Sequence, residues 1–170
     1  MTRADKALRY ADVRQRINTT LANEHNPITV MAIVTAILKE SFPQFFWVGF
    51  LLVEKNEMVL GPFQGPPACL RLPLDSKGVC GTCYRDKQTV LVPDVAAFQG
   101  RVGCDTVSKA EIAVPIIDAN GVAAILDIDC TELSGVDEVD QAELEQVSQF
   151  VAEKTSPFRP PTNDCFFGAL

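Results

Sequence analysis

Two apolar segments joined by a turn sequence constrain the fold of this chain more than any other feature. Residues 111–117 and 122–129 are rich in branched apolar side chains, and the residues between them read Asp118-Ala119-Asn120-Gly121. A short connection of this kind between two such segments predicts an antiparallel β-hairpin. This hairpin opposes a fold built from parallel βαβ units.

The length of the turn sets which residues of the two strands face each other. In a three-residue loop whose last residue, Gly121, lies in the left-handed region, Asp118 is expected opposite Val122. The same register, continued along both strands, places Glu111 opposite Asp129.

This register gathers three carboxylates on one face of the sheet. Side chains alternate along a strand, so Asp127 and Asp129 point to the same side, and Glu111 joins them from the neighbouring strand. A register slipped by one residue would send Glu111 to the opposite face. In a second alternative the strand emerges into solvent and both aspartates are hydrated. The apolar residues that precede and separate the aspartates favour a converged cluster beneath the loop that carries Cys104.

Hydrophobic patterns predict two helices before the sheet and one after it. Apolar residues from Tyr10 to Leu21 recur at spacings of three and four, as on one stripe of a helix. Asn26 followed by Pro27 is a typical helix start. The predicted elements are helices over 4–22 and 27–38, strands over 44–54, 57–60 and 68–72, a short helix over 78–87, a strand over 89–92, the hairpin, and a last helix.

The last predicted helix opens with an acidic run. Asp137, Glu138, Asp140 and Glu143 suit the positive N-terminal end of a helix. We expect this run to form a solvated face.

Composition indicates one soluble globular domain, with 47% hydrophobic and 22% charged residues in a chain of 170. We expect the domain over residues 1–156 and a Pro-rich tail over 157–170.

A net charge of -7 without a Lys/Arg cluster argues against nucleic-acid and anionic-membrane partners. The longest uncharged apolar stretch, residues 28–38, is shorter than the ~18 residues of a membrane span. The first residues lack the apolar core of a secretory signal, so we expect a cytoplasmic protein.

The chain has six cysteines, which in a reducing compartment are expected to be thiols or to form transient, functional disulfides. A structural zinc site needs four ligands. The chain offers a single CxxC pair, Cys80 and Cys83, and a single histidine, His25, far from it. We therefore predict no metal and no cofactor.

Two residues outside the hairpin are candidates for a functional site. Cys80 lies between Gly78 and Gly81 at the predicted start of the short helix, where a helix N-terminus is expected to lower the pKa of its thiol. Trp47, in an aromatic-rich strand, either packs in the core or forms a wall of an apolar pocket.

Cys104 and the three acids together are suited to sulfoxide reduction. A thiolate that attacks a sulfoxide needs a proton for the departing oxygen, and a crowded set of carboxylates keeps one member protonated near neutral pH. The attack leaves a sulfenic acid, which a second cysteine condenses into a disulfide. Cys69 and Cys80 are the candidate resolving thiols.

Five motifs carry a resemblance to a known family. They are GPFQGPPAC ending at Cys69, GVCGT around Cys80, CDTVS from Cys104, EIAVP from Glu111 and LDID ending at Asp129. In this order they resemble the GAF-domain free methionine-R-sulfoxide reductases, from about Trp47 to the last helix. The resemblance implies an α+β GAF-like fold, with an antiparallel sheet of about six strands between helical layers and a pocket over one sheet face.

The resemblance also implies roles. Cys104 would attack free L-methionine-(R)-sulfoxide, Cys69 would be the usual resolving partner, and Cys80 would be able to join the exchange. Residues that would hold and activate the substrate are Glu111, Asp127, Asp129 and the pocket aromatic Trp47. A thioredoxin-type reductant would reopen the disulfide, and a homodimer is left open.

Three positions depart from the family pattern, and two other functions stay open. Cys83 is a bystander or a relay, Ala110 replaces a common serine, and Cys130 is expected to point away from the acids and pack as a small apolar residue. One alternative is a non-enzymatic GAF sensor of a small molecule or of redox state. The other is a CxxC thiol–disulfide oxidoreductase, which the hairpin opposes.

Overall fold

The computed structural model describes residues 2–100 and 107–157. Each predicted helix and strand is present, although several have different ends. No helix in these two ranges is long and apolar enough to cross a membrane. The elements are α1 (Arg3–Thr20), α2 (Pro27–Ser41), β1 (Phe45–Glu54), β2 (Glu57–Gln64), β3 (Arg71–Pro73), α3 (Val79–Asp86), β4 (Val90–Val92), β5 (Ala110–Asp118), β6 (Gly121–Cys130) and α4 (Glu138–Thr155).

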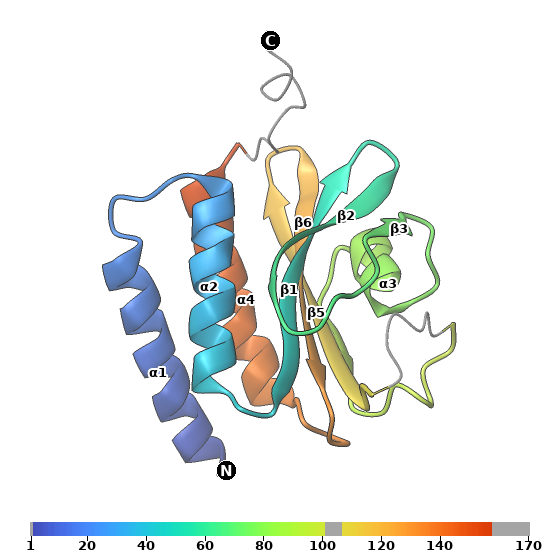
Figure 1. Ribbon diagram of the computed structural model, residues 1–170, viewed down its shortest axis with the longest axis horizontal. Helices are drawn as coiled ribbons and strands as arrows, with labels where there is room; N and C mark the ends of the chain where they lie inside the picture. The colour runs from blue at the N-terminus through green and yellow to red at the C-terminus, as the bar shows by residue number, and fades with distance from the viewer. Residues whose placement is uncertain (1, 101–106, 158–170) are drawn as a thin grey trace, which may run out of the picture.

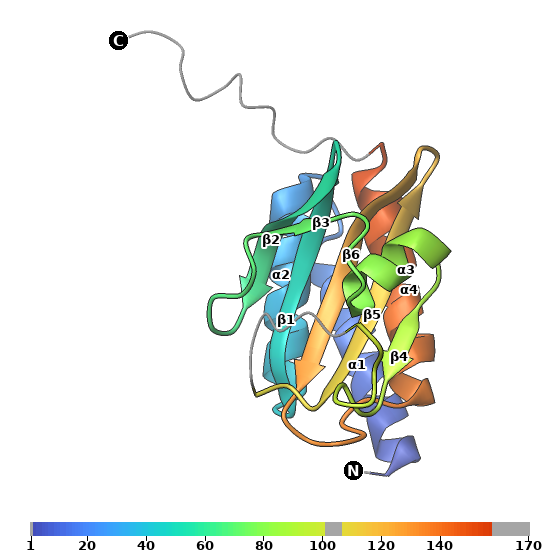
Figure 2. The same cartoon turned by 90° about the vertical axis from the view of Figure 1, so that its right-hand side faces the viewer.

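The strands form one six-stranded sheet in the order β3-β2-β1-β6-β5-β4, and each neighbouring pair is antiparallel. Helices α2 and α4 cover one face, and α1 packs on the outside of both (Figure 1). Helix α3 lies on the opposite face, against β4, β5 and β6 (Figure 2). The expected α+β fold with an antiparallel sheet is confirmed.

Side-chain caps start the first two helices. The Thr2 hydroxyl accepts a hydrogen bond from the Asp5 N–H at 3.1 Å, and the Asp5 carboxylate accepts one from the Thr2 N–H at 3.2 Å. The Asn26 side chain accepts from the N–H groups of Ile28 and Thr29 at 3.0 and 3.1 Å. The predicted apolar stripe of α1 is buried, so both the helix and its core-facing side are confirmed.

The turn between β5 and β6 differs in detail from the expectation. Asp118 pairs with Gly121 and not with Val122, so that part of the prediction is wrong. Gly121 has the expected positive φ, at 119°. A register shift between Ile116 and Ile117 then adds one residue on the β6 side, as a β-bulge does. Because the bulge makes up the one-residue difference, the rest of the ladder has the predicted register.

The two faces of the sheet belong to two separate cores. Ile112 and Ile128 pack into the core beneath the helices α1, α2 and α4. Ala113 and Ile125, which alternate with them along the strands, pack into a smaller core with α3. Cys130 lies in the first core, which confirms that it points away from the acids.

Strand β2 continues past Gly61 and Pro62, where the sequence predicted a break. The ladder between β1 and β2 shifts register here, since Gly49 pairs with Phe63 and Leu51 already pairs with Leu60. A proline at a bulge costs no ladder hydrogen bond, so the strand passes through.

The acidic start of α4 is only in part a solvated face: Glu138 is exposed, but for Asp140 the expectation is wrong. Asp140 is fully buried, and its carboxylate accepts hydrogen bonds from Lys6 Nζ at 2.6 Å and from the Tyr10 hydroxyl at 2.8 Å. Lys6 Nζ also lies 2.8 Å from the Asp137 carboxylate. These contacts join α1 to the first turn of α4.

Candidate active site

The three predicted carboxylates converge on the α3 face of the sheet. Glu111 on β5 pairs with Asp129 on β6, and Asp127 lies two residues before Asp129 on the same face. Asp127 and Asp129 are each 9% exposed. The alternatives of a slipped register and of a strand end in solvent are therefore both wrong.

Helix α3 holds the Cys80 thiol against these acids. Cys80 is almost fully buried, and its Sγ lies 3.9 Å from Oε1 of Glu111. The helix comes close to the preceding loop at Gly81, where a Cβ atom would lie 2.0 Å from the Ser76 carbonyl oxygen. The glycine after Cys80 thus permits the approach that sets the position of the thiol.

The pKa of Cys80 is raised well above its ordinary value, so the expected lowering is wrong. Burial is the largest cause, followed by the negative charges of Asp127 and Glu111. Desolvation and these carboxylates disfavour the thiolate and outweigh the partial positive charge at the start of a short helix. Cys80 is therefore a protonated thiol at neutral pH.

Trp47 forms a wall of a small cavity beside two of the acids. Trp47 pairs with Asp129 across the β1–β6 ladder, and its Nε1 donates a hydrogen bond to the Pro66 carbonyl at 3.0 Å. The ring stacks on Phe63, with centroids 5.7 Å apart. The cavity, of about 40 Å³, is lined by residues that include Trp47, Asp127, Asp129 and Cys69. Of the two interpretations of Trp47, the pocket wall agrees with this geometry.

Gly49 is a site residue that the sequence analysis missed. A Cβ atom at this position would lie 2.2 Å from Cη2 of Trp47, so the indole ring occupies the space that a side chain would take. The signal was present, because a glycine inside an otherwise apolar central strand often marks a close approach.

Cys69 lies on the same cavity and takes part in a disulfide. It is half-buried and precedes β3. Cys80, Cys83 and Cys130 are free thiols, so none of these three is its partner. The predicted nucleophile, Cys104, lies outside the described residues.

The other two described thiols are buried in the cores. Burial, with smaller effects from Asp127 and Asp86, raises the pKa of Cys83. Burial, with a smaller effect from Asp140, raises the pKa of Cys130 to about 12. Both are protonated and fully buried, which favours the bystander interpretation of Cys83 over the relay.

Cys80, Glu111 and Asp127 are a set that could hold a metal ion, because their ligand atoms lie within 4.8 Å of one another. Binding would require the Cys80 thiol to lose its proton, which its surroundings disfavour. The absence of a metal cofactor stays a prediction.

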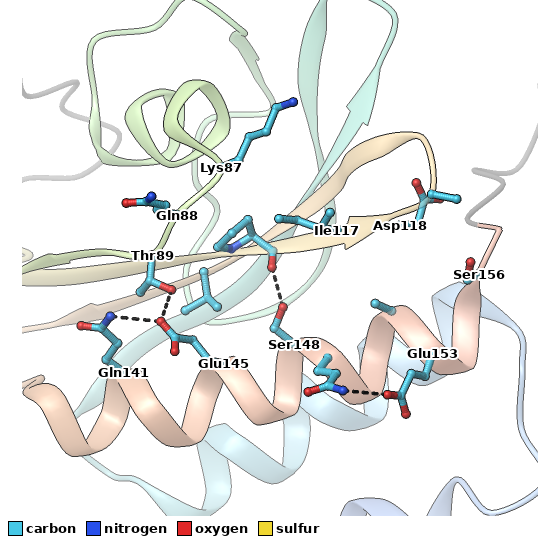
Figure 3. Close-up of a pocket in the computed structure, with 15 residues that line it drawn as sticks. Lys87, Gln88, Thr89, Ile117, Asp118, Gln141, Glu145, Ser148, Glu153 and Ser156 are labelled. Atoms are coloured by element: carbon cyan, nitrogen blue, oxygen red, sulfur yellow. Dashed lines mark hydrogen bonds between the residues drawn. The ribbon is translucent and has the colours of Figure 1, made fainter.

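A larger groove of about 750 Å³ lies elsewhere, between α4 and the end of the hairpin (Figure 3). Several of its polar side chains bond to one another or to the backbone. Ser148 Oγ donates to the Pro115 carbonyl at 2.5 Å, and the Glu145 carboxylate accepts from Thr89 at 2.7 Å and Gln141 at 3.0 Å (Figure 3). Among the residues that the structure describes, its lining includes no cysteine, whereas that of the smaller cavity includes Cys69.

The sheet with its helices on both faces and the cavity lined from β1, β2 and β6 define a GAF domain, and the family model for the GAF domain matches residues 24–153. A free methionine-R-sulfoxide reductase of Escherichia coli is 37% identical over 138 residues, which cover 81% of this chain and 83% of the relative. GAF domain-containing protein A of Dictyostelium discoideum is 42% identical over 148 residues, which cover 86% and 92%.

A solved structure is also similar to this chain in both sequence and fold. The free methionine-R-sulfoxide reductase of Neisseria meningitidis, in complex with its substrate, aligns with a TM-score of 0.84 and 37% identity over 88% of this chain and 89% of that one. The chain belongs to the family of GAF-domain free methionine-R-sulfoxide reductases.

Proposed function

We propose that the protein reduces free methionine-(R)-sulfoxide to methionine, with Cys104 as the attacking thiolate and Cys69 as the resolving thiol. The observation that carries the proposal is the meeting of a disulfide-bonded Cys69, the Trp47 ring and two buried aspartates on one cavity. The family membership supports the same reaction.

The acids on the α3 face are suited to a free amino acid. A free substrate carries an ammonium group, which Asp127, Asp129 and Glu111 can pair with, whereas a methionine within a peptide has none. The Trp47 ring offers an apolar surface to the thioether part of the side chain. Selectivity for the free amino acid therefore follows from the charge of the pocket.

The chemistry has two steps in which sulfur changes oxidation state. The Cys104 thiolate attacks the sulfoxide group, its oxygen and a proton pass to the cysteine, and methionine leaves as the thioether. One of the three carboxyl groups is the proposed donor of that proton. Cys69 then attacks the Cys104 sulfenic acid, forms the disulfide and releases water.

Cys80 is the proposed second resolving thiol, because it lies against the same acids. Its raised pKa means that Glu111 or Asp127 must take up its proton before it reacts. Cys80 is therefore expected to react later and more slowly than Cys69.

The cavity in this state is small for a substrate pocket. Its volume of about 40 Å³ is well below the roughly 300 Å³ at which small-molecule pockets usually begin. We infer that the substrate enters after the disulfide of Cys69 has been reduced and the segment that carries Cys69 is no longer tied. A cytoplasmic dithiol of the thioredoxin type is the proposed reductant, and a homodimer stays a prediction.

The experiment that tests this function is steady-state turnover with dithiothreitol as reductant, followed as methionine formed. The substrates are the R and S epimers of free methionine sulfoxide and a peptide that contains methionine sulfoxide. We expect turnover of the free R epimer alone. No turnover of any of the three would instead support a non-enzymatic GAF sensor.

A further inference from the structure

Leu70 follows the disulfide-bonded Cys69 and exposes a large apolar side chain. It is 68% exposed, and the nearby Pro66 and Pro67 are exposed as well. A single exposed leucine is ordinary on a protein surface. The position of Leu70 is not ordinary, because its neighbour is half of a redox-active bond in the proposed reaction.

The backbone fixes Leu70 at the edge of the sheet. Its carbonyl accepts a hydrogen bond from the Leu60 N–H at 2.9 Å, and β3, which begins at the next residue, pairs only with β2 among the described strands. Strand β3 is the outermost strand on its side of the described sheet. Its outer edge can therefore pair with an extended segment of another protein.

We propose that Leu70, together with Pro66 and Pro67, is the docking surface for the dithiol reductant that opens the disulfide of Cys69. This inference rests on the proposed function. A reductant must bring its attacking sulfur to the Cys69 sulfur, so the surface next to Cys69 is the one that it covers. The small area of one leucine and two prolines fits a transient redox encounter, which buries little surface, and is too small for a permanent dimer.

The exchange balances in electrons and protons. The reductant thiolate attacks Cys69 Sγ, the disulfide breaks, and its second sulfur leaves as a thiolate that takes a proton. The other thiol of the reductant then attacks the mixed disulfide and releases Cys69 as a thiol. Two electrons pass from the dithiol, which leaves as a disulfide.

The test compares two reductants on one substitution. Leu70→Ser is assayed with free methionine-(R)-sulfoxide, once with dithiothreitol and once with thioredoxin, its reductase and NADPH. A small dithiol needs no docking surface, so dithiothreitol-driven turnover is expected to stay at the wild-type rate. The kcat/KM for thioredoxin is expected to fall about tenfold, through a higher KM, as for the loss of a central apolar contact.

Leu8→Ser is the matched control, because Leu8 is 72% exposed and lies on α1, across the sheet from α3. It is expected to leave both turnover rates unchanged. Equal kcat/KM for thioredoxin in wild type and Leu70→Ser would overturn the docking surface. An equal loss of turnover with both reductants, together with a change in sedimentation coefficient, would also overturn it. That result would assign the surface to a second copy of the chain.

A failure of the proposed function gives a different result. The wild-type protein would then show no turnover with dithiothreitol, whatever the state of Leu70. A direct readout that does not need turnover is the mixed disulfide with a thioredoxin that lacks its second active-site cysteine. Mass spectrometry is expected to place this bond at Cys69 and to find it formed more slowly in Leu70→Ser; a bond at another cysteine overturns the inference.

Discussion

The Sγ atom of Cys80 lies 3.9 Å from Oε1 of Glu111, so helix α3 holds a buried thiol directly over a sheet face that carries three acids. Cys80 and Glu111 are 31 residues apart in the sequence. A thiol that can take part in redox chemistry therefore lies next to groups that can donate or accept a proton.

The first prediction concerns the pH dependence of Cys80 alkylation. Burial and the charges of Asp127 and Glu111 raise its pKa, so in the wild type the rate should keep rising above pH 9. Asp127→Asn removes one of those negative charges, and the midpoint should move to lower pH. The rate at which iodoacetamide alkylates Cys80, followed by mass spectrometry over a range of pH, gives this midpoint. The control is Glu132→Gln, which changes an exposed acid beyond the end of β6. An equal midpoint in the wild type and both variants would contradict the electrostatic account.

The second prediction concerns the acids as proton donors and substrate ligands. Glu111→Gln keeps the shape of the side chain but removes a titratable group, and kcat/KM for the free sulfoxide should fall ~100-fold or more. Glu132→Gln should leave kcat/KM within twofold of the wild type. A wild-type kcat/KM in Glu111→Gln would exclude Glu111 from both roles.

The third prediction concerns the close approach of Trp47 to Gly49. Gly49→Ala places a methyl group where the indole ring lies, so the ring must move and the pocket wall with it. We expect a KM for the sulfoxide at least tenfold higher and a loss of about 1–3 kcal/mol in the free energy of unfolding. Gly61→Ala, whose new methyl would meet Leu52, is the matched control: it should lower stability and leave the KM unchanged. Equal KM values in both variants would mean that Trp47 does not contact the substrate.

The fourth prediction concerns the buried charges that join α1 to α4. The Lys6 and Asp140 side chains are 8% and 0% exposed, so Lys6→Met removes one member of a buried ion pair and should lower the free energy of unfolding by about 3 kcal/mol. Arg3 and Glu138 form an ion pair whose side chains are 77% and 74% exposed, and Arg3→Met should cost less than about 1 kcal/mol. Urea denaturation measures both. Equal losses would show that burial does not set the contribution of these pairs.

Local patterns in the sequence predicted the parts of the fold that depend on neighbouring residues. The stripe from Tyr10 to Leu21, the Asn26 cap and the pairing of Glu111 with Asp129 are each governed by helical period, capping or turn length, and each is confirmed. The bulge after Gly121 corrected the error in the turn, so the acids still meet.

Such local patterns could not predict contacts between residues that are far apart in the sequence. The burial of Asp140 depends on Lys6, which lies 134 residues away in the sequence. The raised pKa of Cys80 depends on carboxylates from another part of the chain, whereas the sequence showed only its position at a helix start. Gly49 and Trp47 were both visible, but their contact requires the orientation of the indole ring.

The central claim is that cysteines of this chain reduce the sulfoxide and end as a disulfide. The most direct test is a single turnover: fully reduced protein, freed of reductant, is mixed with an excess of free methionine-(R)-sulfoxide. We predict about one methionine per chain, the loss of two thiols per chain and a new disulfide between Cys69 and Cys104. Cys104→Ser should form no methionine. Methionine formed by Cys104→Ser at the wild-type level, or formed without loss of thiols, would contradict the account.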